Sequence, residues 1–152
     1  KRIRQGVINN GVIMKIQGSI MNRIQESACM FPIDFKVTVG FGGTEYMWSD
    51  KHAYSVCSVD QNWRNKNFEI IGVQQDNAER VDNNGASESQ SYRFTPNTAG
   101  YICYLKSEIV ETVNGKRKLY KPVIWNEETK RWNKGGASVT LGHRSEYHDF
   151  SF

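Results

Sequence analysis

Hydrophobic and polar residues alternate along several short stretches of this chain. Apolar side chains occupy every second position from Ile33 to Phe41, and a similar alternation runs through 12–20. Because successive side chains of a strand point to opposite faces of a sheet, this pattern is typical of strands with one face on a core and one in water. Four further stretches are predicted as strands, at 53–59, 68–73, 92–95 and 137–141.

The stretch 101–125 gives the clearest local prediction. Two β-rich runs flank Asn114-Gly115, and Asn-Gly is a preferred pair for a type I′ turn because both residues tolerate positive φ. The sequence therefore predicts a β-hairpin that turns at these two residues. A further turn is predicted at 126–130, where polar residues follow the second run.

Helical patterns are scarce in this chain. Only 21–29 favours a helix, with Ile20 and Ile24 at a spacing of i, i+4. The longest polar stretch, 74–90, predicts an exposed loop. Strands that follow one another without intervening helices form antiparallel sheets, so the pattern indicates a sandwich or barrel.

Residues 97–103 read Asn-Thr-Ala-Gly-Tyr-Ile-Cys. This run resembles the strand-F corner of immunoglobulin-like domains, where a turn precedes Tyr-X-Cys. The resemblance implies a Greek-key sandwich in which Tyr101 is the corner tyrosine and Cys103 is bridged to Cys57. The predicted fold class is therefore all-β, an antiparallel sandwich of Greek-key, jelly-roll or immunoglobulin-like topology, with at most one short helix near residues 21–29.

The length of 152 residues is that of one domain, and no apolar run approaches the roughly 20 residues that span a membrane. We predict a single β-sandwich domain over 1–152, with a basic N-terminal arm at 1–11. Residues 1–25 carry five basic and no acidic residues. This charge suits contact with nucleic acid or another acidic partner, and it also suits a solvated terminus.

The second strand of the predicted hairpin and the residues after it combine basic and aromatic side chains. Basic groups neutralise phosphates, and exposed rings stack on bases or sugars or form the centre of a protein interface. The structural alternative is that the tryptophans belong to the core and the lysines protect an edge strand from pairing. The candidate binding residues are Lys116, Arg117, Lys118, Tyr120, Lys121, Trp125, Arg131 and Trp132.

The three cysteines, Cys29, Cys57 and Cys103, allow at most one disulfide within the chain. Cys57 and Cys103 lie near the centres of predicted strands. A Cys57–Cys103 disulfide between two sheets and buried reduced thiols are both compatible with that placement.

Motifs for catalysis and for metal binding are weak. The sequence contains neither Gly-X-Ser-X-Gly nor a Cys-His signature, although Asp50 and His52 could form an acid–base pair. Metal sites need three or four converging ligands, and a strand would place His143 and His148 on opposite faces. We therefore expect no catalysis, no metal and no cofactor.

These observations favour a non-catalytic binding module, secreted or exposed at a surface, that recognises a protein or glycan through loops and the basic aromatic hairpin. One alternative is a small viral or phage structural protein of coat type, within the virion, whose basic arm contacts nucleic acid. A small enzyme or toxin of unrecognised type is a further alternative. A homo-oligomer is compatible with the first two.

Overall fold

The computed structural model of this chain describes residues 30–150, and within this range the structure consists mainly of strands. One turn of 3₁₀ helix, η1 (Trp63–Asn65), follows β3. The predicted all-β antiparallel fold is confirmed. The strands are β1 (Phe31–Pro32), β2 (Gly42–Tyr46), β3 (Lys51–Asp60), β4 (Ile70–Gln75), β5 (Asn77–Arg80), β6 (Tyr92–Thr95), β7 (Ile102–Thr112), β8 (Gly115–Asn126), β9 (Arg131–Lys134) and β10 (Val139–Leu141).

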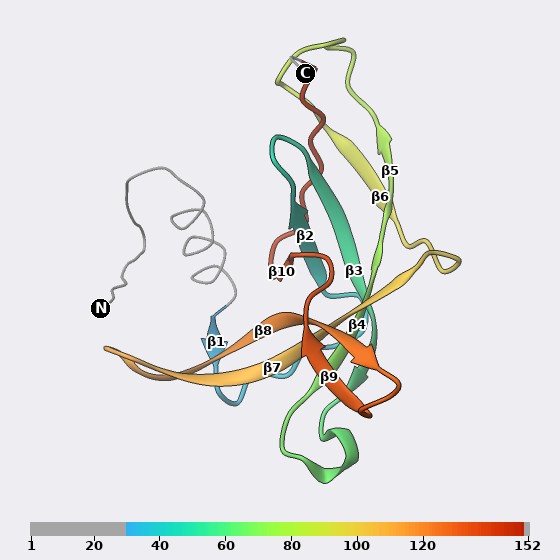
Figure 1. Cartoon of the computed structure of the whole chain (residues 1–152). Coiled ribbons are helices and arrows are strands. Elements are labelled where there is room, and N and C mark those ends of the chain that lie inside the picture. Colours follow the sequence, from blue (N-terminus) through green and yellow to red (C-terminus); the bar gives the residue numbers. More distant parts are fainter. Residues whose placement is uncertain (1–29, 151–152) are drawn as a thin grey trace.

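Most of these strands form one large antiparallel sheet that curls on itself (Figure 1). Its order is β1-β8-β7-β4-β3-β2-β10, and β9 pairs with the end of β8. Strand β10, at one end of this order, also approaches β8 near the other end. The curl therefore encloses one face of the sheet, as in a sandwich or barrel. Strands β5 and β6 form a separate two-stranded ribbon.

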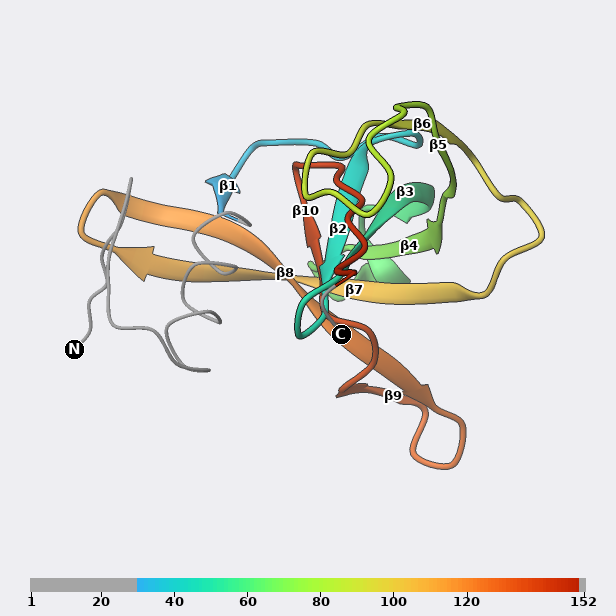
Figure 2. The same cartoon turned by 90° about the horizontal axis from the view of Figure 1, so that it is seen from above.

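Strand β8 pairs with three other strands of the large sheet. One of its edges pairs with β7 along most of its length, and the other pairs with β1 at its beginning and with β9 at its end. The far end of the β7–β8 hairpin projects from the rest of the sheet, as Figure 1 and Figure 2 both show.

The predicted hairpin forms, but its turn is not type I′. Thr112 pairs with Gly115, and Gly115 has φ +101°, whereas Asn114 is not among the residues with positive φ. Hairpins with a turn followed by a glycine at positive φ are a common alternative. The hydroxyl of Thr112 fixes the turn, since it accepts from the Asn114 N–H (3.1 Å) and donates to the Gly115 carbonyl (2.7 Å).

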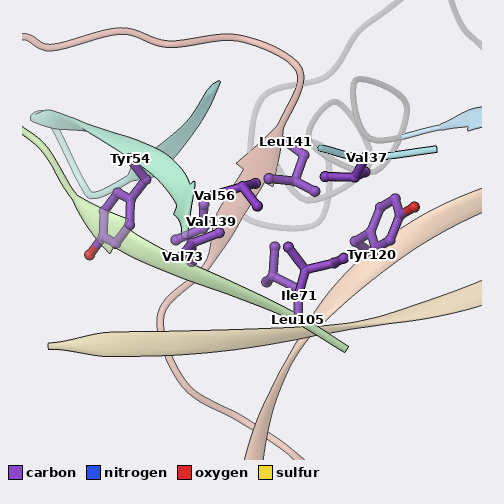
Figure 3. Packing of buried hydrophobic residues seen from close by; sticks show 9 residues of the cluster. All are labelled: Val37, Tyr54, Val56, Ile71, Val73, Leu105, Tyr120, Val139 and Leu141. Carbon is purple, nitrogen blue, oxygen red and sulfur yellow. The ribbon is translucent and has the colours of Figure 1, made fainter. Parts of the chain in front are cut away.

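The hydrophobic core lies on the concave face (Figure 3). Residues two apart on one strand point into it together, as Ile71 and Val73 do on β4, because the side-chain period of a strand is two. Phe31 and Phe35 stack with centroids 4.6 Å apart and pack against this core. The buried cluster consists of Val37, Tyr54, Val56, Ile71, Val73, Leu105, Tyr120, Val139 and Leu141.

The predicted strand at 33–41 is wrong, because the structure contains no strand over these residues. The backbone turns at the start, where the Phe35 N–H donates to the Pro32 carbonyl (3.0 Å). Phe35 and Val37 pack in the core, whereas Val39 is 67% exposed. Alternating apolar positions therefore also suit an irregular segment that covers part of a core.

The other predicted strands within residues 30–150 overlap observed ones, and the turn at 126–130 lies between the paired strands β8 and β9. Strands β1, β2, β5 and β9 lie where no strand was expected, and β5 falls inside the predicted polar loop at 74–90. The predicted strand at 12–20, the helix near 21–29 and the arm at 1–11 lie outside the described residues. No helix in the described part of the chain is long and apolar enough to cross a membrane.

Lys118 and Glu69 form an ion pair inside the curled sheet. The Lys118 Nζ lies 2.5 Å from Oε2 of Glu69, and the two side chains are 4% and 8% exposed. Lys118 also donates to the Phe35 carbonyl (2.7 Å), and the Tyr120 hydroxyl donates to Oε1 of Glu69 (2.8 Å). The Glu69 N–H donates to the Ser107 hydroxyl (2.7 Å). Burial, together with the bond to Glu69, raises the pKa of the Tyr120 hydroxyl well above its usual value.

Gly115→Val should destabilise the hairpin. A β-branched residue resists positive φ, and the open space around Gly115 means that the cost is conformational rather than a steric clash. We expect a loss of roughly 1–2 kcal/mol in the free energy of unfolding, measured by urea denaturation. Gly115→Asn is the control and should cost less, because Asn tolerates positive φ. Equal stability of the valine variant and the parent would contradict this assignment.

Lys118→Met should cost about 3–5 kcal/mol in the free energy of unfolding, because it leaves the buried Glu69 carboxylate without its cation. The double variant Lys118→Met/Glu69→Met removes both charges, so its loss should be clearly smaller than the sum of the two single losses. Urea denaturation of the three variants measures the coupling. Additive losses would mean that the two groups do not interact.

Candidate functional site

The eight residues predicted as a basic aromatic surface fall into two separate regions. One region is the first part of β8, towards the projecting end of the hairpin, and the other is the paired end of β8 and β9. The first contains Lys116, Arg117, Lys118 and Tyr120, the second contains Trp125, Arg131 and Trp132, and Lys121 lies between them.

Lys118 and Tyr120 do not belong to a surface, which corrects their assignment as binding residues. Their exposed fractions are only 4% and 2%, because both side chains point to the concave face and bind Glu69 there. Lys116 is exposed near the hairpin turn, and Lys121 is partly exposed and pairs with Glu108 at 3.4 Å.

The second region is part of a larger group of rings, which we call the aromatic patch: Trp63, Phe68, Tyr104, Trp125 and Trp132. Trp125 and Trp132 are paired across β8 and β9, with ring centroids 5.1 Å apart. Trp63 meets both of them edge to face, at 5.6 and 6.0 Å. All five side chains are half-buried, and none belongs to the core cluster.

The patch lies on the convex face of the sheet. Leu105 points into the core, so its neighbour Tyr104 points the opposite way, and the Tyr104 ring lies 5.2 Å from that of Trp132. Tyr104 lies opposite Val123 in the hairpin, and Trp125 is two residues further along the same face. Counting back from Asn114-Gly115 places Tyr104 on the same face as Trp125, so the hairpin signal in the sequence is sufficient to find Tyr104.

The loop between β3 and β4 supplies Trp63 and Phe68, which stack with centroids 5.5 Å apart and an interplanar angle of 23°. Arg64 also belongs to this loop, and its guanidinium lies 4.7 Å from the centroid of Trp63 and 5.4 Å from that of Trp125. Lys106 on β7 places its ammonium 4.4 Å from the Phe68 centroid. Each of these cations is therefore held at the face of an aromatic ring.

Two features of the patch are unfavourable for stability, and a third leaves cations available to a ligand. Arg64 has φ +46°, and a non-glycine residue in this region of φ/ψ space costs free energy. The Trp132 Nε1 atom is buried without a hydrogen-bond partner among the described residues. Neither Arg64 nor Lys106 forms an ion pair with a carboxylate in residues 30–150. Such features are more common at binding sites than in surfaces selected for stability alone.

Glu127 is the carboxylate next to the patch. It accepts a hydrogen bond from Nε1 of Trp125 (3.0 Å) and forms an ion pair with Lys130. The bonds from Lys130 and Trp125 lower the pKa of Glu127, so the carboxylate stays ionised. The positive charge of Arg64 also lowers the pKa of Glu127, although Arg64 forms no ion pair with it.

The imidazoles considered for acid–base chemistry hold the last described segment onto the sheet. Nδ1 of His52 lies 3.1 Å from Oε2 of Glu146, whose Oε1 accepts the Ala53 N–H at 2.9 Å. His148 lies 3.6 Å from Asp50, and Asp50 also accepts the Asp149 N–H. His52 and Asp50 are thus paired with groups from the C-terminal segment and not with each other. This corrects the predicted acid–base pairing of Asp50 with His52. The contacts with the C-terminal segment give both residues a structural role. The His143 carbonyl accepts a hydrogen bond from Thr44.

Cys57 and Cys103 are free thiols in this structure, and the Cys57–Cys103 bridge is not formed. They lie on β3 and β7, which belong to the same sheet with β4 between them. Two strand spacings amount to roughly 9–10 Å, whereas a disulfide requires Cα atoms within about 7 Å. Tyr101 is 91% exposed, so it is not a buried corner tyrosine either.

No group of three or more metal-ligating side chains converges within residues 30–150. No protein-family model, no curated protein and no solved structure matches this chain. The aromatic patch is therefore identified as the candidate site from its own geometry.

Both Cys57 and Cys103 should react with iodoacetamide in denatured protein without added reductant, as measured by peptide mass mapping. In the native protein near neutral pH the reaction should be slower, because burial raises the pKa of both thiols and the thiolate is the reactive form. If the two cysteines stay unlabelled until a reductant is added, they are bridged and this arrangement is wrong.

Proposed function

We propose that this protein is a non-catalytic binding module that recognises a protein or glycan partner through the aromatic patch. One observation carries the proposal. Five rings from β7, β8, β9 and the β3–β4 loop meet outside the core and remain half-buried. Tryptophan, tyrosine and arginine are the residues most enriched at the energetic centres of interfaces.

The way in which the patch is built supports this proposal. A hydrophobic core already fills the concave face, so the convex rings are not needed to enclose it. The rings are held by strand pairing, with Trp125 opposite Trp132, which gives a rigid platform. Rigid aromatic side chains lose little conformational entropy when they bind, so they contribute strongly to affinity.

The alternative of a coat-type protein depends on the basic residues at 1–25, outside the described residues, and stays a prediction. The His52–Glu146 and His148–Asp50 contacts are those expected of groups that attach one chain segment to another. They support a non-catalytic role for these four side chains.

The test compares Trp63→Ala with the parent protein on an array of glycans and an array of 12-residue peptides. Trp48→Ala is the matched control, because Trp48 is 92% exposed in the turn between β2 and β3 and lies outside the patch. We expect at least one array to bind the parent, with binding about tenfold or more weaker in Trp63→Ala and unchanged in Trp48→Ala.

Circular dichroism of each variant would show that the fold is intact, and Trp63→Phe should retain most of the binding because it keeps a ring. Equal binding by Trp63→Ala and the parent would contradict the proposal. So would an equal loss in Trp48→Ala, or a parent protein that binds neither array.

A further inference from the structure

The aromatic patch carries positive charges that form no ion pair with a carboxylate of residues 30–150. Arg64 and Lys106 contact ring faces and form no ion pair within that range. Arg131 and Lys134 on β9 are exposed and are also absent from the ion pairs there. By contrast, Lys121 and Lys130 are paired with Glu108 and Glu127. Cations without an ion pair are therefore present around the rings, and they also occur elsewhere in residues 30–150, as at Lys36, Lys116 and Arg117.

The Arg64 side chain is positioned by its contacts with two aromatic rings. Its backbone is left-handed, and its guanidinium is placed against the faces of Trp63 and Trp125. A guanidinium held against aromatic rings keeps N–H groups that can bind both oxygens of one carboxylate. A flexible exposed arginine would have to lose more conformational entropy to form the same contact.

The cations also restrict what can bind the rings. Nucleic-acid bases and neutral sugars bind by stacking on open ring faces. Here Arg64 lies over faces of Trp63 and Trp125, and Lys106 lies over a face of Phe68. A ligand that approaches these faces therefore contacts the positive charges of Arg64 and Lys106, and beside them it contacts the edges of the rings.

From this arrangement we infer that the partner is an acidic polypeptide segment, with carboxylates that pair with Arg64 and Lys106 and apolar side chains that pack beside the rings. The inference rests on the proposed function and specifies its partner. A sulfated glycan would satisfy the cations but would leave the apolar edges of the patch without contacts. An acidic segment with interspersed apolar residues would satisfy both.

The experiment measures binding of the full chain to 12-residue peptides. The peptides vary independently in their content of glutamate and in their content of leucine and phenylalanine. Heparin, a neutral glycan and an oligo-dT strand are the comparison probes. We expect the tightest binding to peptides that combine both residue classes, with affinity falling as salt is raised. Arg64→Gln and Lys106→Gln should each weaken that binding about tenfold, and Arg64→Lys should restore part of it.

Arg93→Gln is the matched control, because Arg93 is exposed on β6, outside the large sheet, and should leave binding unchanged. Acidic-peptide binding that is unaffected by Arg64→Gln and Lys106→Gln would overturn the inference, as would tighter binding to heparin or oligo-dT. If neutral peptides or glycans bind and Trp63→Ala weakens that binding, the inference fails but the proposed function stands. If no probe binds in a way that depends on Trp63, both fail.

Discussion

A curled sheet encloses one of its faces, and here the enclosed face contains an ammonium group among apolar side chains. Lys118 can remain there only because Glu69, 2.5 Å away, balances its charge and the Phe35 carbonyl accepts a second bond. These contacts join β8 to the chain before β4 and to the irregular segment after β1. The same strand pairs with β7, β1 and β9, so the position of the convex surface also depends on β8.

The two faces of the sheet have different roles. The concave face is packed with aliphatic and aromatic side chains, and its Lys118 and Glu69 are paired with each other. The convex face carries the aromatic patch, with a left-handed Arg64, a Trp132 Nε1 that has no partner in the described part of the chain, and cations without carboxylates there. The proposed recognition therefore uses the face opposite to the main core cluster, so substitutions in the patch can change binding without removing that cluster.

Individual residues show how far prediction from the sequence could go. The hairpin at Asn114-Gly115 was located correctly because turn formation depends on a few neighbouring residues. The register counted from that turn would have placed Tyr104 on the same face as Trp125. Trp63 could not be assigned in this way, because it reaches the patch through a loop whose path depends on packing. The alternation at 33–41 reflected burial of Phe35 and Val37 and not strand pairing.

The sequence by itself determined the all-β class and the position of the main hairpin, because the two-residue period and the turn residues act locally. Alternation along β8 also places Lys118 and Tyr120 on one face of the sheet and Leu119 and Lys121 on the other. It does not determine which of the two faces is enclosed. The tertiary structure decided that question, since the curl and the partner Glu69 come from distant parts of the chain. It likewise brought together the five rings and the two cations of the candidate site, because long-range packing and not local pattern fixes where loops and strand ends meet.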